Sequence, residues 1–315
     1  MLCLQLIRSS KWWWPYSSLI NPYNPTRRQK SNKNIKKYYG INEMPEYLRF
    51  NRWILTGYRS SNLSTMECIQ SVCEIHNETV NIMTHLIPII YIVFNYHDLF
   101  ESQLFGSYLT YCHIISCLSS WIGSLCYHIF MNHYCGSKIY HHLLKVDMLG
   151  IWITQTFGAF TTIQASFIMF DESIRYYSVI IYLMISIFAL FKGLTATEAW
   201  QRPASFALLV TIRVICFIVR IRTHQNYDLM NYYVNYNINN NNNQISSIIS
   251  TYRHVIGQEI WPIIGAIIAV TRIPERFFNG KFDYFLNSHN IMHCLVVLGG
   301  LHMHWSFIDD IKFFI

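Results

Sequence analysis

Long apolar stretches alternate with short polar segments along most of this chain, from Val80 to the end. Seven such stretches occur, and most are long enough to cross about 30 Å of hydrocarbon as an α-helix. Their approximate bounds are 80–100, 106–130, 146–170, 176–191, 204–221, 255–273 and 289–307. The pattern predicts an all-α fold, a seven-transmembrane helix bundle over residues 80–315.

The segments outside these stretches have a different pattern. Residues 1–65 show no sustained hydrophobic period, and residues 27–37 are rich in lysine, which predicts a largely disordered arm. From residue 66, apolar side chains recur at i, i+3, i+4 and i+7, which predicts a short amphipathic helix over residues 66–79. This helix is expected either in the membrane interface or as an ordinary surface helix. The Asn-rich residues 231–243 predict a solvated loop between the fifth and sixth helices.

The composition also favours a membrane protein, because 52% of the residues are hydrophobic and only 13% are charged. Eleven of the 24 basic residues lie before Val80, together with five of the 17 acidic ones. A basic segment beside an apolar body is typical of a cytoplasmic flank that faces anionic lipid, whereas nucleic-acid binding calls for a basic face on a soluble domain. We therefore predict an integral membrane protein with a cytoplasmic arm and no nucleic-acid partner.

Basic residues near the helix ends predict the orientation. With the arm inside, the cytoplasmic loops carry Lys138, Lys145, Lys192, Arg202, Arg272, Arg276 and Lys281. One outer loop carries Arg220, Arg222 and Arg253 and argues the other way, but the arm outweighs it. The N-terminus is therefore expected in the cytoplasm and the C-terminus outside, and no cleaved signal peptide is expected at the start.

Ionisable side chains at membrane depth are costly and usually functional, so those that share a depth are of most interest. Ser124 and His128 lie at i and i+4 near the end of the second predicted helix, and Asp147 opens the third. His289 and His293 lie at i and i+4 near the start of the seventh. Four crossings separate the end of the second helix from the start of the seventh, so all five residues are expected near the same membrane face.

Three histidines in this arrangement suit a zinc ion. Two histidines at i and i+4 project from one helix face about 6 Å apart, and a third imidazole leaves one tetrahedral position for water. We therefore predict Zn2+ ligands at His128, His289 and His293, in a catalytic type of site that brings the pKa of the water to about 7. Asp147 is the expected base, and Ser124 is the expected hydrogen-bond donor to a substrate carbonyl or oxyanion.

Each of these signals also has a simpler explanation. Two histidines at a helix start can form a hydrogen-bonded polar pair without a metal. Ser124 can bond its own helix backbone, and Asp147 can cap the start of the third helix, where the helix dipole favours it. Their shared depth is what favours a site.

Other polar residues favour structural roles. Glu78, Asn81 and His85 share one face of the first helix and predict a buried hydrogen-bonded strip. Arg213 in the fifth helix can face a cavity, pair with an acidic group or indicate a misplaced helix boundary. His304 lies too far along the seventh helix to reach the zinc. The nine cysteines are odd in number and form no C-x-x-C pair, so those in apolar runs are interpreted as small buried hydrophobes.

From about Tyr39 onward, the sequence resembles the progestin and adipoQ receptor family, which is adiponectin receptor-like and haemolysin III-related. The resemblance rests on HNETVNIMTH (76–85), Ser124-x-x-x-His128, Lys145-Val-Asp147 and IPERFFNGKFDYFLNSHNIMH (273–293). It implies zinc ligands at the same three histidines, with Asp147 near the zinc-bound water and Ser124 beside it. The family belongs to a wider set of membrane hydrolases that includes alkaline ceramidases.

Two functions follow as hypotheses. The first is a zinc-dependent amidohydrolase of ceramidase type that acts on a ceramide-like lipid. The second is a receptor or scaffold with structural zinc, in the Golgi or plasma membrane, that binds a cytosolic Raf-like kinase or a peptide or steroid ligand. Gly57-Tyr-Arg59 and the segment 77–81 look most similar to the third family member, which is known for holding Raf kinase at the Golgi.

Overall fold

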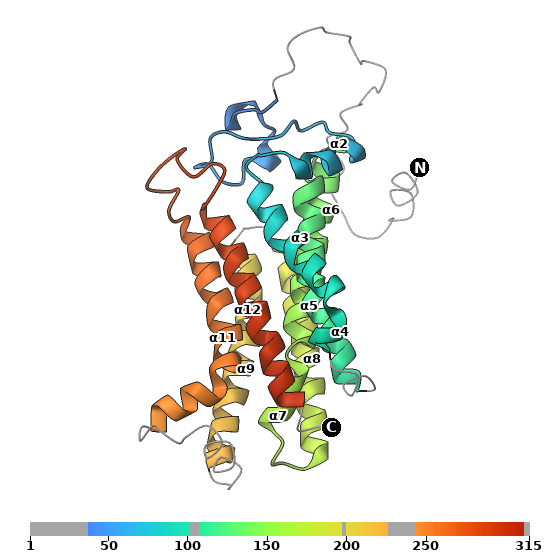
Figure 1. Cartoon of the computed structure of the whole chain (residues 1–315), viewed down its shortest axis with the longest axis vertical. Helices are drawn as coiled ribbons and strands as arrows, with labels where there is room; N and C mark the ends of the chain where they lie inside the picture. The colour runs from blue at the N-terminus through green and yellow to red at the C-terminus, as the bar shows by residue number, and fades with distance from the viewer. Residues whose placement is uncertain (1–36, 101–106, 197–199, 226–243, 312–315) are drawn as a thin grey trace. The chain divides into compact units, whose positions relative to one another are not determined.

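A computed structural model describes residues 37–100, 107–196, 200–225 and 244–311 of the chain (Figure 1). The described part is all-α, and its helices of 16 or more residues are seven in number. They are α3 (Thr79–Phe94), α5 (Tyr108–Phe130), α6 (Ser137–Phe157), α8 (Glu172–Leu194), α9 (Gln201–Gln225), α11 (Gln244–Thr271) and α12 (Ser288–Ile311). Each predicted apolar stretch overlaps one of them.

The third predicted stretch differs most from the structure. Helix α6 begins at Ser137, well before the predicted start at residue 146, and ends at Phe157. The rest of the stretch turns at Gly158 and forms a separate short helix, α7 (Phe160–Ser166). The early start was not visible in hydropathy, because the first turns of α6 are polar on one side and are held by packing against α5.

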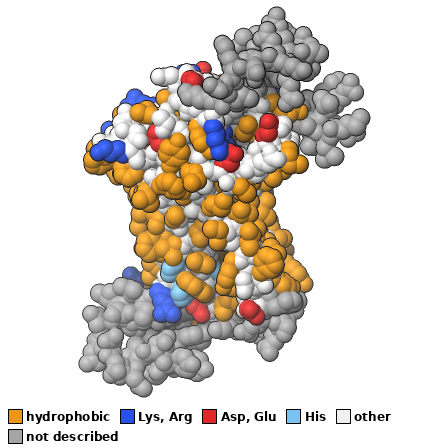
Figure 2. All heavy atoms as spheres, turned by 45° about the horizontal axis from the view of Figure 1, so that its top comes forward, with side chains coloured by type: hydrophobic (Ala, Val, Ile, Leu, Met, Phe, Trp, Pro, Cys, Tyr) orange, Lys and Arg blue, Asp and Glu red, His pale blue; other side chains and the backbone are white. Residues whose placement is uncertain are grey.

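Five helices are long and apolar enough to cross a membrane, judged by length and composition among the described residues. They are α5, α8, Ala204–Thr223 of α9, Tyr252–Thr271 of α11, and α12, and the shorter α3 is also apolar. Large apolar side chains such as Met184, Ile187 and Phe188 on α8 are more than half exposed. Figure 2 shows such side chains over the middle of the visible face, with the charged ones nearer its ends. A surface of this kind suits lipid.

Residues 37–64 fold against one end of the bundle, so the predicted disorder of the whole arm 1–65 is wrong for this part. The segment contains η1 (Ile41–Glu43) and η2 (Glu46–Leu48). Leu48 and Tyr58 are buried in a hydrophobic cluster with residues of α5 and α6. Sequence periodicity missed the segment because each apolar side chain is buried by distant parts of the chain rather than by a repeating local face. Residues 1–36 of the predicted arm lie outside the described residues.

Hydrogen bonds to two carboxylates hold this cap, residues 37–64, to the loop before α12. The backbone N–H groups of Leu55 and Thr56 donate to the Asp283 carboxylate at 3.0 and 2.8 Å. Asn51 donates to Glu275 at 3.0 Å. Both segments lie at the end of the bundle where α3 and α12 begin (Figure 1).

The predicted amphipathic helix over 66–79 is shorter in the structure. Helix α2 (Thr65–Gln70) continues into the 3-10 helix η3 (Ser71–Cys73) and then stops. Ser64 and Glu67 form a reciprocal capping box at its start, with bonds of 3.3 and 2.7 Å. It packs on α5, so it is at least partly a protein-bound helix.

The bundle contains a larger core toward the end opposite the cap. It joins buried side chains of α5, α6, α7, α8, α9 and α12, among them Leu109, Ile163, Leu209 and Phe307. Helices α5 and α6 approach very closely at Gly150. Any side chain at this position would overlap the backbone carbonyl of Ser119. Small residues at such crossings permit close backbone packing in membrane bundles.

Candidate metal centre

Three histidines from α5 and α12 meet at the capped end of the bundle. His128 lies on the last turn of α5, and His289 and His293 lie on the first two turns of α12. One ring nitrogen from each lies within 4.8 Å of the others, and the Nε2 atoms of His289 and His293 are 3.2 Å apart. The three imidazoles predicted as ligands therefore do lie together.

His128 is held in one orientation by a carboxylate at the N-terminal end of α3. Its Nδ1 lies 2.7 Å from Oε2 of Glu78, the residue just before α3, and Asn81 donates to the same oxygen at 2.7 Å. Burial raises the pKa of Glu78, but its hydrogen bonds to His128 and Asn81 outweigh this and lower the pKa to about 2. The carboxylate is therefore ionised and accepts the Nδ1–H of His128.

This orientation leaves the other ring nitrogen of His128 available to a metal ion. Its Nε2 is buried and has no hydrogen-bond partner among the described residues. A buried imidazole nitrogen without a partner is costly, whereas a metal ion would satisfy it. The donor set of three imidazoles, with a carboxylate behind one of them, fits a transition-metal ion such as zinc.

The two histidines of α12 have different surroundings. The Nδ1 of His293 lies 3.3 Å from the Thr84 hydroxyl, and its ring stacks on His85 with centroids 4.2 Å apart. The backbone N–H of His289 donates to the side chain of Asn287 at 3.1 Å, which caps the start of α12. His293 is buried and His289 is only partly so.

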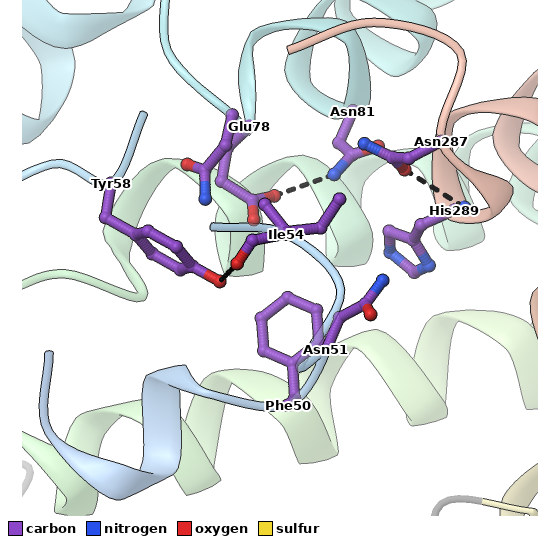
Figure 3. Close-up of a pocket in the computed structure, with 9 residues that line it drawn as sticks. Phe50, Asn51, Ile54, Tyr58, Glu78, Asn81, Asn287 and His289 are labelled. Carbon is purple, nitrogen blue, oxygen red and sulfur yellow. Dashed lines mark hydrogen bonds between the residues drawn. The ribbon is translucent and has the colours of Figure 1, made fainter. Parts of the chain in front are cut away.

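A pocket reaches the site from the side of His289. Figure 3 shows Phe50 and Asn51 of the cap across from Asn81 and Asn287, with the His289 ring between them. The pocket is lined by Phe50, Asn51, Ile54, Tyr58, Asn77, Glu78, Asn81, Asn287 and His289. The cap therefore contributes directly to the wall of the site, which sequence analysis did not predict.

Arg59 connects the cap to the helix that carries His128. Its guanidinium donates to the backbone carbonyls of His128 and Ile129 at 2.6 and 3.1 Å and to Ser71 at 2.7 Å. The C-terminal carbonyls of a helix lack internal partners, and a cation suits this end of the helix dipole. Gly57, two residues earlier, has a φ of 82°, which a residue without a side chain adopts at little cost.

Glu275 holds the start of α12, as Arg59 holds the end of α5. Its carboxylate accepts from the backbone N–H of Ser288 at 2.8 Å and from the Ser288 hydroxyl. A negative charge is favourable at a helix N-terminus. The long motif from residue 273 to 293 thus has a structural basis, because it places His289 and His293 against His128.

Ser124 and Asp147 lie on neighbouring faces of α5 and α6. Ser124 is buried one turn before His128. A methyl group added at Gly123 would lie 3.2 Å from the Asp147 Cα, so the Asp147 backbone packs against α5 at Gly123, the residue before Ser124. Because Asp147 lies well inside α6 rather than at its start, the helix-capping explanation is wrong. The catalytic roles of these two residues stay predictions.

The profile of the haemolysin III-related proteins matches residues 73–305, well over half of the chain. The chain belongs to the haemolysin III-related family. Progestin and adipoQ receptor family member 4 of Homo sapiens is 30% identical over 269 residues, which cover 85% of this chain and 90% of that protein. The ADIPOR-like receptor IZH1 of Eremothecium gossypii is 26% identical over 292 residues, 88% of this chain and 85% of that one. This member of the family is a multi-pass integral membrane protein.

The prediction that this chain is most similar to the third progestin and adipoQ receptor is not supported. Family member 3 of Mus musculus is 23% identical over 282 residues, 83% of this chain and 82% of that one, which is less than the 30% shared with human member 4. The short motifs at 57–59 and 77–81 lie in the cap and beside the metal centre, where Arg59 and Glu78 contact His128.

Glu78 is the functional residue that sequence reasoning undervalued. The sequence predicts a buried hydrogen-bonded strip of Glu78, Asn81 and His85, and this is confirmed for Glu78 and Asn81, since Asn81 donates to Glu78 and accepts from Asn290, each at 2.7 Å. It is not confirmed for His85, which is buried and stacks on His293 but whose Nδ1 has no hydrogen-bond partner among the described residues. The contact of Glu78 with His128 could not be predicted, because it joins residues 50 positions apart. For Arg213, pairing with an acidic group is correct, since it donates twice to Glu259 at 2.6 and 2.8 Å.

Proposed function

We propose that His128, His289 and His293 bind Zn2+ and that the protein hydrolyses the amide bond of a ceramide-like lipid. The observation that carries the proposal is the convergence of three imidazoles around the buried, unpartnered Nε2 of His128, beside a pocket that reaches His289. Bound zinc would supply a Lewis acid for the carbonyl and would lower the pKa of water. Three neutral nitrogen ligands with one open position are typical of catalytic zinc.

The protein's own residues would serve the reaction as follows. Glu78 keeps His128 in the tautomer with a free Nε2, and Asp147 accepts a proton from the attacking water and passes it to the leaving amine. Ser124 donates a hydrogen bond to the oxygen on which negative charge develops. Water adds across the C–N bond, so the products are a sphingoid base and a fatty acid. The exposed apolar faces of the helices let the lipid enter sideways from the bilayer.

The proposal is tested with Asp147→Asn, using hydrolysis of a fluorescent ceramide by the purified full chain and metal content as readouts. We expect the variant to retain zinc and to lose most of its hydrolytic rate, and Ser124→Ala to lose about 10²-fold. Asp171→Asn, at the exposed start of α8, is the matched control and should keep the full rate. An Asp147→Asn protein with zinc and an unchanged rate would exclude Asp147 as the base.

A receptor or scaffold function is the second candidate. Residues 1–36 contain seven lysines and arginines and no acidic residue, which suits recruitment of an acidic cytosolic partner such as a Raf-like kinase. Under this proposal the zinc is structural and the ligand, if any, is a peptide or steroid. His289→Ala should abolish turnover under the first proposal, while deletion of residues 2–36 should abolish recruitment under the second.

The membrane arrangement forms part of both proposals. We place seven spans in the membrane, corresponding to α3, α5, α6, α8, α9, α11 and α12, with the N-terminus in the cytoplasm of a Golgi or plasma membrane. The basic arm and the basic loops support this orientation. Selective permeabilisation of cells that carry an N-terminal or a C-terminal epitope tests it. An N-terminal epitope accessible from outside intact cells would reverse it.

A further inference from the structure

A second cluster of metal-ligating side chains lies between α5 and α12. The Nε2 of His113 is 3.2 Å from the Nδ1 of His304 and 3.3 Å from the Sγ of Cys117. All three ligand atoms lie within 4.8 Å of one another. His113 and Cys117 are at i and i+4 on one face of α5, and His304 faces them from α12.

This cluster is separate from the histidine centre described above. His113 precedes His128 by 15 residues on α5, and a rise of 1.5 Å per residue puts the two about 22 Å apart along the helix. Along α12, His304 follows His293 by 11 residues, so it is also displaced away from the histidine centre. One ion cannot bridge the two groups, so the cluster needs an explanation of its own.

The spacing of the three ligand atoms matches one coordination sphere. With metal–nitrogen bonds of about 2.0–2.1 Å and metal–sulfur bonds of about 2.3 Å, ligand atoms around one tetrahedral ion lie roughly 3.3–3.6 Å apart. Of the two short separations here, 3.2 Å falls just below that range and 3.3 Å lies at its lower limit. Because both converge on one nitrogen of His113, a small outward movement of the side chains would accommodate an ion.

Two buried aromatic rings pack against the histidines of this cluster. Phe307 stacks on the His113 ring with centroids 4.0 Å apart and planes inclined by 5°. Phe100 packs edge-on against His304 at 5.3 Å, and both phenylalanines are buried. These rings exclude water, so a soft sulfur–metal bond meets little competition, while the partly exposed His304 leaves an approach for the ion.

We propose that His113, Cys117 and His304 form a second metal site, for a thiophilic d10 cation, Zn2+ or Cu+. The thiol of Cys117 releases its proton on binding, and the resulting thiolate neutralises one positive charge of the ion. The two imidazoles bind as neutral ligands. The site is built from α5 and α12 alone and does not depend on hydrolysis at the first centre.

Cobalt titration of the metal-free full chain in detergent tests the site. Co2+ bound by thiolate has a sulfur-to-metal charge-transfer band in the near ultraviolet, which a centre of three histidines cannot produce. We expect two equivalents of Co2+ and this band in the unmodified protein. Cys117→Ser should abolish the band and one equivalent, and His304→Gln should weaken cobalt binding at the same site at least tenfold.

Three matched variants test whether the cobalt signal comes from this cluster. Cys126→Ser on α5 and His302→Gln on α12 should keep the band, because neither residue belongs to the cluster. The triple variant His128→Gln, His289→Gln, His293→Gln should lose the other equivalent and keep the band, so failure of the first centre is distinguishable. Displacement of Co2+ by Zn2+ or by Cu+ under reducing conditions then distinguishes the two ions.

The unmodified protein alone can overturn the proposal, whatever the folding of the variants. A chain that binds a single equivalent of Co2+ without the charge-transfer band has no thiolate site, and the cluster is then a hydrogen-bonded polar group. A band that survives Cys117→Ser would assign the thiolate to another cysteine and would equally refute the site.

Discussion

Glu78 connects three helices through one carboxylate. It accepts from His128 of α5 and from Asn81 of α3, and Asn81 in turn accepts from Asn290 of α12. These bonds orient the imidazole that presents its Nε2 to the candidate metal position. Removing the negative charge should therefore act on metal affinity.

We expect Glu78→Gln to lower zinc affinity by about 10–100-fold, the usual effect of losing a carboxylate behind a histidine ligand. Competition with a chelating dye measures the change. Glu74→Gln is the control, because Glu74 is partly exposed and pairs with Lys37 at 3.6 Å, away from the site. Equal zinc affinity in Glu78→Gln and the unmodified protein would show that the carboxylate does not support the ligand.

His76 provides a test of pH dependence. Its Nε2–H points to the Ser71 carbonyl at 3.1 Å, and its Nδ1 accepts from the Glu78 backbone N–H at 3.0 Å, so the native ring is neutral. Burial, helped by the charge of Arg59, lowers the pKa of His76 from 6.5 to about 3. The pKa is depressed in the folded state, so the stabilisation is fully present above pH 6.5 and is lost as pH falls toward 3.

We therefore expect the melting temperature to fall as pH decreases from 6.5 toward 3, with a loss of up to about 1.4 kcal/mol per pH unit from this one group. In His76→Gln the amide cannot titrate, so the slope should be shallower even if the variant is less stable at neutral pH. The melting temperature of both proteins is measured by tryptophan fluorescence across this pH range. Parallel slopes for the two proteins would contradict the assignment.

At the scale of elements, buried ion pairs hold α9 in place. Arg213 pairs with Glu259 of α11 and also donates to Tyr182 of α8 at 2.8 Å. About two turns further along α9, Arg220 pairs with Asp310 of α12 at 2.7 Å. In apolar surroundings, a charge whose partner is removed is costly, while the intact pair contributes mainly to which helices meet.

Arg213→Leu should destabilise the protein by about 3–5 kcal/mol, because Glu259 is left without its counter-charge. The double variant Arg213→Leu, Glu259→Leu should recover a large part of that loss. Chemical denaturation in detergent measures both, with the exposed Arg222→Ala expected to change stability by less than about 0.5 kcal/mol. Strictly additive effects of the two leucine substitutions would show that the pair is not coupled.

At the scale of the whole molecule, the contacts of the cap determine which truncations are informative. The cap buries Met44, Leu48 and Tyr58 against α5 and α6, and Arg59 holds the end of α5. Deleting residues 2–36 should therefore leave the melting temperature unchanged. Deleting residues 2–64 should lower it by many degrees and weaken zinc binding.

Fluorescence-detected size exclusion after heating compares the two truncations with the full chain, and zinc content is measured on the same samples. The shorter deletion serves as the control for the longer one. Equal melting of both would mean that the cap does not stabilise the bundle.

The sequence by itself determined the all-α class, the places of the long apolar helices and the pairs Ser124/His128 and His289/His293 on single helix faces. These features are local, because helical periodicity and hydropathy depend only on residues within a few turns. Parity of the crossings was enough to bring His128 to the end of the bundle that carries His289 and His293.

Only the tertiary structure decided which side chains from different elements touch. The Glu78–His128 contact, the meeting of His113 with His304, the early start of α6 and the fold of the cap each join residues far apart in the chain or depend on packing by a distant partner. Such contacts are set by helix rotation and by close packing at positions such as Gly150, and no periodic pattern in one segment contains that information.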